Sequence, residues 1–311
     1  MKKVLFATTA LVASAGIASA QGVALSGGAE IGIYQGKVGD IEFWHDIDVK
    51  FTLSGETDNG LTFGATIDLD EVSAGISAAA NPSSVFLSGN FGTLTMGDTD
   101  GAFDWALREV GIGSAIADDH TTHSGFSGNS AYDGAYDGQI ARYDYSFGDF
   151  GIAVSAELDD TGVGDPGFQI GAKWAGDVGG VRLGVGIGYG SADIGVAGAS
   201  ETEVGISLSV SSGGFTGILN YVDLGDSDGG GVSETHTAIG IGYTMDALTL
   251  SANWGQFEEG ASTQSGYGIA VNYDLGGGAA VQFGYGNTDS CGVYAGCTTG
   301  DTFSLGVAMS F

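Results

Sequence analysis

Apolar and polar residues alternate strictly in short runs along most of the chain. The last run, DTFSLGVAMSF (301–311), places Phe303, Leu305, Val307, Met309 and Phe311 at one parity and small or polar residues at the other. Side chains on a strand point to opposite faces with period two, so each run predicts a strand with one oily face. That face could turn inward in a soluble sandwich or outward in a membrane barrel.

Strands predicted in this way follow one another along the whole chain. They comprise residues 23–34, 43–54, 61–69, 84–91, 93–98, 142–147, 150–158, 168–174, 181–189, 203–210, 215–222, 236–244, 247–255, 266–273, 279–286 and 302–311. Short connections such as GETDNG (55–60) alternate with long ones rich in Asp, Gly and Ser. Short turns at one end, long loops at the other and an even strand number are typical of outer-membrane barrels, whereas a soluble sandwich has no reason for that regularity.

The polar face of these strands carries charge, at Glu30, Asp46, Asp48, Lys50, Asp68, Arg142, Asp144, Glu157, Lys173, Arg182 and Glu203. A dry core disfavours such residues, whereas a water-filled lumen solvates them. Aromatic residues near strand ends predict interfacial girdles, at Tyr34, Phe150, Tyr189, Tyr221, Tyr243, Trp254, Tyr267, Tyr273, Tyr285 and Phe311. The fold class expected is all-β: a 16-stranded antiparallel transmembrane β-barrel with long extracellular loops, wide enough for an aqueous channel.

The N-terminal twenty residues have a different pattern. Lys2 and Lys3 precede an apolar stretch (4–17), and residues 18–20 form an A-x-A site, which together predict a signal peptide over residues 1–20. Residues 21–311 are then expected to form a single barrel domain. No other segment approaches the roughly 18 to 20 apolar residues of a spanning helix, so crossing a membrane would require a closed barrel.

Composition agrees with this interpretation and indicates cationic partners. Glycine accounts for 59 of 311 residues and proline for only 2, which suits tight turns and a glycine-rich inner face, where we expect open space. Eight Lys and Arg residues stand against 38 Asp and Glu residues, a net charge of −30. No nucleic acid partner is expected, and cations are favoured. Acidic loops that only keep an exported protein soluble would show the same balance.

Few residues suggest other chemistry. Cys291 and Cys297, the only cysteines, lie in the stretch CGVYAGC, and in an exported protein we expect a disulfide between them rather than a metal pair. Asp118, Asp119 and His120 are candidate ligands of a divalent cation such as Ca²⁺, but a solvated acidic loop is the preferred interpretation, so no cofactor is expected. The four histidines are scattered and no Ser-His-Asp set stands out, so we expect no enzyme.

One connection is far longer than usual. Residues 98 to about 139, called the third loop below, separate two strands by roughly forty residues, a length typical of functional loops. A short helix is predicted there, with Asp100 as N-cap and Gly111 as terminator, because apolar residues recur at helical spacing (Phe103, Ala106, Leu107 and Val110). We expect this segment to fold into the barrel and narrow the pore; a surface lid or an ordinary extracellular loop is the alternative.

The stretch SSVFLSGNFGTLTMGDTDGAFDWALREVG (83–111) resembles the paired strands and inward third loop of the general porins of Gram-negative bacteria, in particular the alphaproteobacterial type. VALSGGAEIGIY (23–34), FTLSGETDNGLTFGA (51–65), YDLGGGAAVQFGYG (273–286) and the terminal aromatic residue are similar to the same family. The resemblance is vague through 157–265. It implies a homotrimer of sixteen-stranded barrels, in which the third loop forms the acidic side of a constriction and faces a basic wall.

Carried over by position, the resemblance implies constriction residues on the third loop: Asp98, Asp100, Asp104, Arg108, Glu109, Asp118 and Asp119. The lumen wall candidates are Asp46, Asp48, Lys50, Arg142, Lys173 and Arg182. The chain departs from the family at this wall, because Asp46 and Asp48 accompany Lys50 where a basic cluster is implied. A predominantly negative pore follows.

These features together predict an outer-membrane porin, exported and embedded in outer-membrane lipid. We expect it to pass small hydrophilic solutes and ions passively, with a preference for cations. Phe311 would lie on the lipid-facing parity near the periplasmic interface as an assembly residue. The alternative is an outer-membrane barrel with an adhesive or structural role, or with an enzymatic site at its rim.

Overall fold

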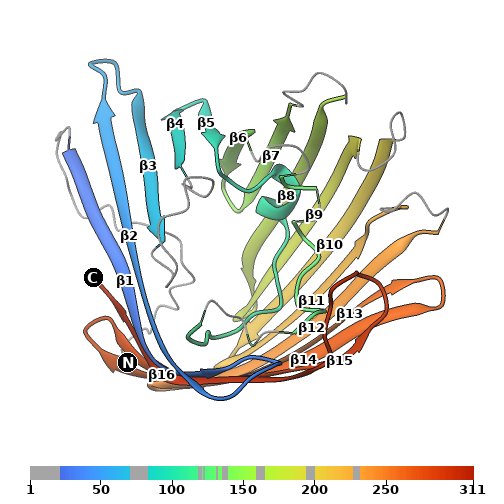
Figure 1. Ribbon diagram of the computed structural model, residues 1–311. Helices are drawn as coiled ribbons and strands as arrows, with labels where there is room; N and C mark the ends of the chain where they lie inside the picture. The colour runs from blue at the N-terminus through green and yellow to red at the C-terminus, as the bar shows by residue number, and fades with distance from the viewer. Residues whose placement is uncertain are drawn as a thin grey trace.

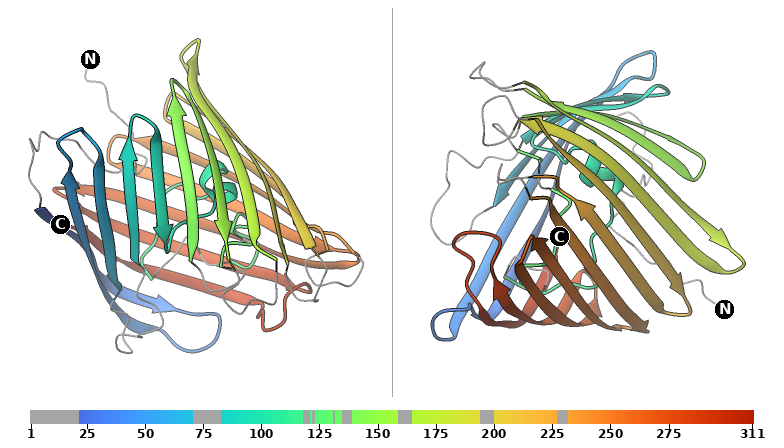
Figure 2. Two further views of the ribbon diagram at one scale, coloured as in Figure 1. Left: turned by 90° about the horizontal axis from the view of Figure 1, so that it is seen from above. Right: turned by 90° about the vertical axis from the view of Figure 1, so that its right-hand side faces the viewer.

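Sixteen strands form one closed antiparallel barrel in the computed structural model (Figures 1 and 2). The structure describes residues 22–70, 83–117, 121, 123–130, 132–134, 139–158, 165–193, 200–226 and 232–311, so the expected signal peptide lies outside the described residues. None of the helices within these ranges is long and apolar enough to cross a membrane. The predicted all-β fold, a closed 16-stranded antiparallel barrel, is confirmed.

Each strand pairs with its neighbours in sequence, and β1 also pairs with β16, which closes the ring through Gly28↔Ser310 to Gln35↔Phe303. The elements are β1 (Gly22–Gln35), β2 (Glu42–Glu56), β3 (Thr62–Asp70), β4 (Ser83–Gly89), β5 (Gly92–Gly97), α1 (Ala102–Ala106), β6 (Ile140–Phe147), β7 (Phe150–Glu157), β8 (Gly167–Val178), β9 (Val181–Asp193), β10 (Ser200–Ser212), β11 (Phe215–Asp223), β12 (Glu234–Met245), β13 (Leu248–Glu259), β14 (Ser262–Gly276), β15 (Ala279–Cys291) and β16 (Gly300–Ser310).

The expected alternation of short and long connections has one exception. The link between β13 and β14 was expected to be long, but both strands extend until Glu259 pairs with Ser262. Gly260 adopts a φ of +58° in the tight turn between them, a left-handed conformation that glycine enters without steric penalty. The expectation of a long loop was wrong because the alternating pattern weakens before the strands end.

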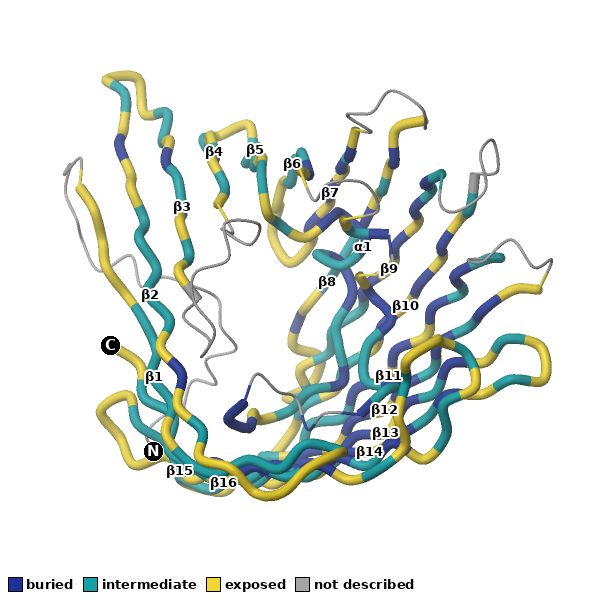
Figure 3. Tube along the Cα trace, viewed as in Figure 1, coloured by how far each residue is buried: buried dark blue, intermediate teal, exposed yellow. Residues whose placement is uncertain are grey.

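The apolar face of the strands points outward: its large side chains are exposed, and exposed and more buried positions alternate along many of the strands (Figure 3). On β16, Thr302 and Ser304 are buried inside the barrel, whereas Leu305 is exposed. Tyr34 differs from the predicted girdle: it pairs with Ser304 and packs near Trp44, with ring centroids 5.8 Å apart. Its even parity on β1 directs it into the lumen, so placing Tyr34 in the girdle was wrong.

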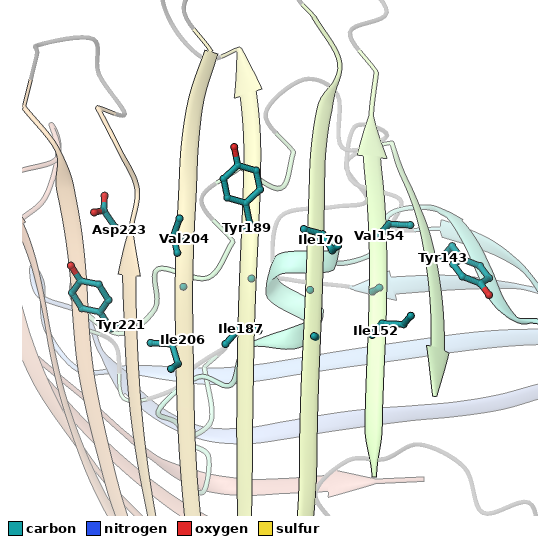
Figure 4. A pocket seen from close by; sticks show the side chains of 15 residues that line it. Tyr143, Ile152, Val154, Ile170, Ile187, Tyr189, Val204, Ile206, Tyr221 and Asp223 are labelled. Atoms are coloured by element: carbon teal, nitrogen blue, oxygen red, sulfur yellow. The ribbon is translucent and has the colours of Figure 1, made fainter. Parts of the chain in front are cut away.

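A shallow hollow of about 930 Å³ lies on the outer wall over β6 to β11 (Figure 4). Aliphatic side chains such as Ile170 and Val204 line it, with Tyr189 and Tyr221 among them. These residues have the outward parity and are about half exposed. The hollow therefore belongs to the face expected to meet lipid and offers no site to a hydrophilic solute.

Backbone hydrogen bonds hold the last residue, Phe311, to β1. Phe311 N–H donates to the Gly27 carbonyl (2.9 Å), and the Phe311 backbone oxygen accepts from Gly27 N–H (3.3 Å), while the Phe311 side chain is 78% exposed. We expect Phe311→Asp to lower the amount of heat-modifiable barrel in the outer-membrane fraction. A charge near the interface costs at most about 1 kcal/mol in the folded barrel, so the loss should arise during insertion. Phe311→Leu is the matched control, and normal levels of the aspartate variant would contradict the assignment.

Candidate pore constriction

The described residues of the third loop lie inside the ring of strands. β5 ends at Gly97 and β6 begins at Ile140, and between them α1 packs against β6, β7, β8 and β9. Figures 1 and 2 show α1 within the barrel, on the side opposite β1 to β3. Phe103 is fully buried there. It clusters with its loop neighbours Ala106 and Leu107 and with Val222, Leu224 and Phe257 of the barrel. The described part of this loop therefore occupies the lumen.

The helix is shorter than its sequence pattern predicts and is capped differently. It spans five residues, Ala102–Ala106, with Gly101 rather than Asp100 at the N-cap, and it ends before Leu107 instead of continuing to Gly111. Its first N–H groups donate to wall side chains: Ala102 N–H to Ser155 Oγ (2.8 Å) and Phe103 N–H to Gln169 Oε1 (3.1 Å). Because the wall satisfies these orphan donors, no local capping residue is required.

Beyond the helix, the loop backbone follows the inner wall and is held at intervals by polar side chains. Wall oxygens accept backbone N–H groups of the loop at four points: Arg108 to Ser207 (2.9 Å), Ser114 to Asn272 (3.1 Å), Ala117 to Glu30 (2.8 Å) and Ser124 to Thr288 (3.2 Å). Wall amides donate in return, as Asn220 does to the Arg108 carbonyl (3.1 Å). Sequence reasoning placed Glu30 on the polar face of the strands but did not predict that these wall residues hold the loop; polar side chains at the inward parity were the available signal.

Wall glycines allow this backbone to approach closely. A Cβ at Gly171 would lie 2.0 Å from the Ala102 carbonyl oxygen, one at Gly240 2.1 Å from that of Val110, and one at Gly255 1.8 Å from that of Gly125. Close approach of a second backbone is a typical reason for glycine within a strand. The sequence-based expectation of open space was therefore wrong at these positions, where the third loop fills the space.

The acidic side of the constriction is partly exposed. Asp98 and Asp100 are exposed, whereas Asp104 and Glu109 are half-buried on the same stretch. Burial, together with the neighbouring carboxylates of Asp100, Glu109 and Asp133, raises the pKa of Asp104 to about 7, and a hydrogen bond from Asn129 acts in the opposite direction. Burial also lowers the pKa of the Arg108 guanidinium. Asp118 and Asp119 lie outside the described residues.

The four cations predicted for the lumen wall are each engaged by an acid or by the third loop. Lys50 pairs with Asp68 (2.7 Å), and Arg182 with Asp177 (3.4 Å). The remaining two hold the segment around α1 by its carbonyls: Arg142 Nη1 donates to Asp100 O (2.6 Å), and Lys173 Nζ donates to Trp105 O (2.8 Å) and lies 3.5 Å from that indole ring centre. The ion pairs offset the charges of Lys50 and Arg182 locally, and the contacts of Arg142 and Lys173 hold these two cations against the third loop.

Acids also line the strands opposite α1. Asp46 is buried on β2 and stands across from Glu30 of β1 in the strand register. Glu30 Oε2 accepts from the Trp44 indole N–H (3.0 Å) and from Ala117 N–H of the third loop (2.8 Å). Asp48 follows on the same face of β2, opposite Gly28. The constriction therefore has carboxyl groups on both of its sides.

The remaining candidates concern the cysteines and metals. Cys291 and Cys297 form a disulfide across the connection between β15 and β16. In the described ranges, no group of three or more His, Cys, Asp or Glu side chains is placed to hold a metal ion. The candidate Ca²⁺ ligands Asp118 and Asp119 fall in the part of the chain that is not described.

Comparison with known proteins gives one family. Residues 7–292 match the model of a Gram-negative porin. A porin of Rhodobacter capsulatus is 29% identical over 292 residues, which cover 86% of this chain and 94% of that protein. A solved porin structure superposes with a TM-score of 0.74 at 24% identity, and a mutant of Rh. blastica porin with 0.63 at 19% identity. Each superposition covers 93% of this chain and 100% of the other, which shows a shared barrel fold.

Proposed function

The chain belongs to the Gram-negative porin family and forms a channel in the outer membrane; we propose that this channel passes small hydrophilic solutes and ions by passive diffusion and prefers cations. The homologues are porins, which favours a channel over an enzyme. The preference for cations follows from the charges that line the constriction.

One observation supports the cation preference most strongly: the wall cations are already engaged, whereas acids lie on both sides of the lumen. Lys173 and Arg142 contact backbone carbonyls of the third loop, and Lys50 is paired with Asp68. Asp98 and Asp100 of the third loop are exposed. Rings of carboxylates concentrate cations and repel anions in a pore.

The preference should be modest and should depend on salt. A hydrated lumen keeps a high dielectric constant, and mobile ions screen fixed charges within about 10 Å at 0.1 M salt and about 3 Å at 1 M. Cations should therefore be favoured clearly in dilute salt and weakly in concentrated salt.

The test is the zero-current potential of the reconstituted protein across a planar bilayer in a salt gradient. We expect a zero-current potential whose sign shows that cations cross more readily than anions. This potential should shrink as both salt concentrations are raised at a constant ratio. Swelling of liposomes in a neutral sugar measures solute diffusion independently of charge. An anion-selective channel would refute the cation preference, and absence of both conductance and swelling would refute the diffusion channel.

The homotrimer remains a proposal that rests on the family resemblance. Cross-linking in native membranes should give a ladder that ends at three subunits, and a ladder that stops at one subunit would contradict it.

A further inference from the structure

The disulfide-closed segment Cys291–Cys297 turns toward the third loop. Its Val293 packs against a buried cluster that joins third-loop residues to the wall: Phe103, Ala106 and Leu107 with Val222, Leu224 and Phe257. The segment lies between β15 and β16, far in sequence from the third loop. The connection between β15 and β16 therefore contacts the part of the third loop that lies in the lumen.

Tyr294 anchors this segment at three points. Its hydroxyl donates to Glu234 Oε1, its backbone N–H donates to Gln264 Oε1 (3.2 Å), and its ring meets Phe257 edge-on with centroids 5.2 Å apart. Glu234 and Phe257 are buried on the inner wall of β12 and β13. The tyrosine thus ties the segment to the same wall that supports the third loop.

Gln264 connects the two segments directly. While its Oε1 accepts from Tyr294, its Nε2 donates to the Ser124 carbonyl of the third loop (3.1 Å). Gln264 is itself buried, so these contacts are sheltered from water. One side-chain amide therefore fixes the distance between the third loop and the disulfide-closed segment.

The other side of Tyr294 faces an open space. The residue is 44% exposed, and it lines a hollow of about 510 Å³ together with Tyr34, Lys37 and Thr302. Tyr34 and Thr302 have the inward parity of β1 and β16. This hollow is therefore part of the lumen near its mouth.

From these contacts we propose that Cys291–Cys297 is a second pore-shaping segment, in which Val293 and Tyr294 hold the third loop in place and Tyr294 narrows the mouth of the channel. The disulfide matters because glycines at 292 and 296 flank the contact residues, and Gly296 has a φ of +84°. Without the covalent bond, these flexible positions would let the segment leave the wall. The inference rests on the channel function and is independent of its cation preference.

The test compares single-channel currents of wild type, Tyr294→Ala, Tyr294→Phe and the double variant Cys291→Ser with Cys297→Ser. We expect the alanine and double-serine variants to conduct more than wild type, roughly by tens of per cent, because conductance follows the residues and radius that line a pore. Open-channel noise should rise with it. Tyr294→Phe keeps the ring and should restore most of the wild-type current.

A reductant added to wild-type channels already inserted in the bilayer should reproduce the double-serine result, and the double-serine channels should not respond to it. This arm needs no variant to fold. If reduced wild-type channels keep their current and noise, the inference fails while the channel function stands. If wild type itself does not conduct, the proposed function fails instead.

Discussion

Gly171→Ala is expected to dislodge α1 from the barrel wall and to raise the single-channel conductance. The new Cβ would lie 2.0 Å from the Ala102 carbonyl oxygen and 2.6 Å from the Ala106 Cβ. The first contact is backbone, so no rotamer change relieves it. Overpacking of this kind costs about 1–3 kcal/mol, and a five-residue helix has little stability of its own with which to resist.

Displacement of α1 should also break the hydrogen bonds that Ser155 and Gln169 accept from it, so a larger part of the third loop should leave the lumen. The strand ladders of β7, β8 and β9 do not involve these side chains, and the barrel itself should stay closed. The variant is therefore expected to admit larger sugars in liposome swelling, in addition to carrying more current.

Gly217→Ala is a control for the loss of a strand glycine, because position 217 has the outward parity of β11 and a Cβ there would meet only Val210 Cγ1, at 3.4 Å. It should conduct like wild type. A Gly171→Ala channel with wild-type conductance and wild-type size limit would show that the contact with α1 does not determine the width of the pore.

The barrel could be predicted from the sequence because each strand pairs with its sequence neighbours and each shows its own alternation of apolar and polar residues. Period-two alternation located all sixteen strands and the direction of their oily faces, as Leu305 and Thr302 illustrate on β16. Parity alone also corrects Tyr34, which was placed in the girdle by its position near a strand end. The tight turn between β13 and β14 was not predicted, because apolar and polar residues alternate only weakly from Gln256 to Gln264.

The constriction was less predictable because contacts between residues far apart in sequence determine it. Nothing local to Ala102 reveals that Ser155 takes the place of an N-cap. Likewise, Lys173 looks like a free lumen cation in the sequence, yet its ammonium group contacts the Trp105 carbonyl and ring. The glycine content did not predict the close approach of the third loop either, because a missing side chain leaves room equally for water or for another backbone.

Raising the pH through about 7 is expected to increase the cation preference of the channel. Burial, with the repulsion of Asp100, Glu109 and Asp133, raises the pKa of Asp104 to about 7. Below that pH Asp104 is mostly neutral, and above it Asp104 adds one negative charge to the constriction. The zero-current potential in dilute salt should therefore move further in the cation direction as the pH rises across this value.

Asp104→Asn should abolish that step and leave a weaker cation preference at high pH. Asp98→Asn is the matched control on the same loop: it removes an exposed carboxylate and should lower the preference while the step near pH 7 persists. His123 is not a competing source of the step, because burial lowers its pKa to about 4. A step that survives unchanged in Asp104→Asn would assign the titration to another group. Because salt at 1 M screens charges beyond about 3 Å, the step should also fade there if it arises from a fixed charge acting on passing ions.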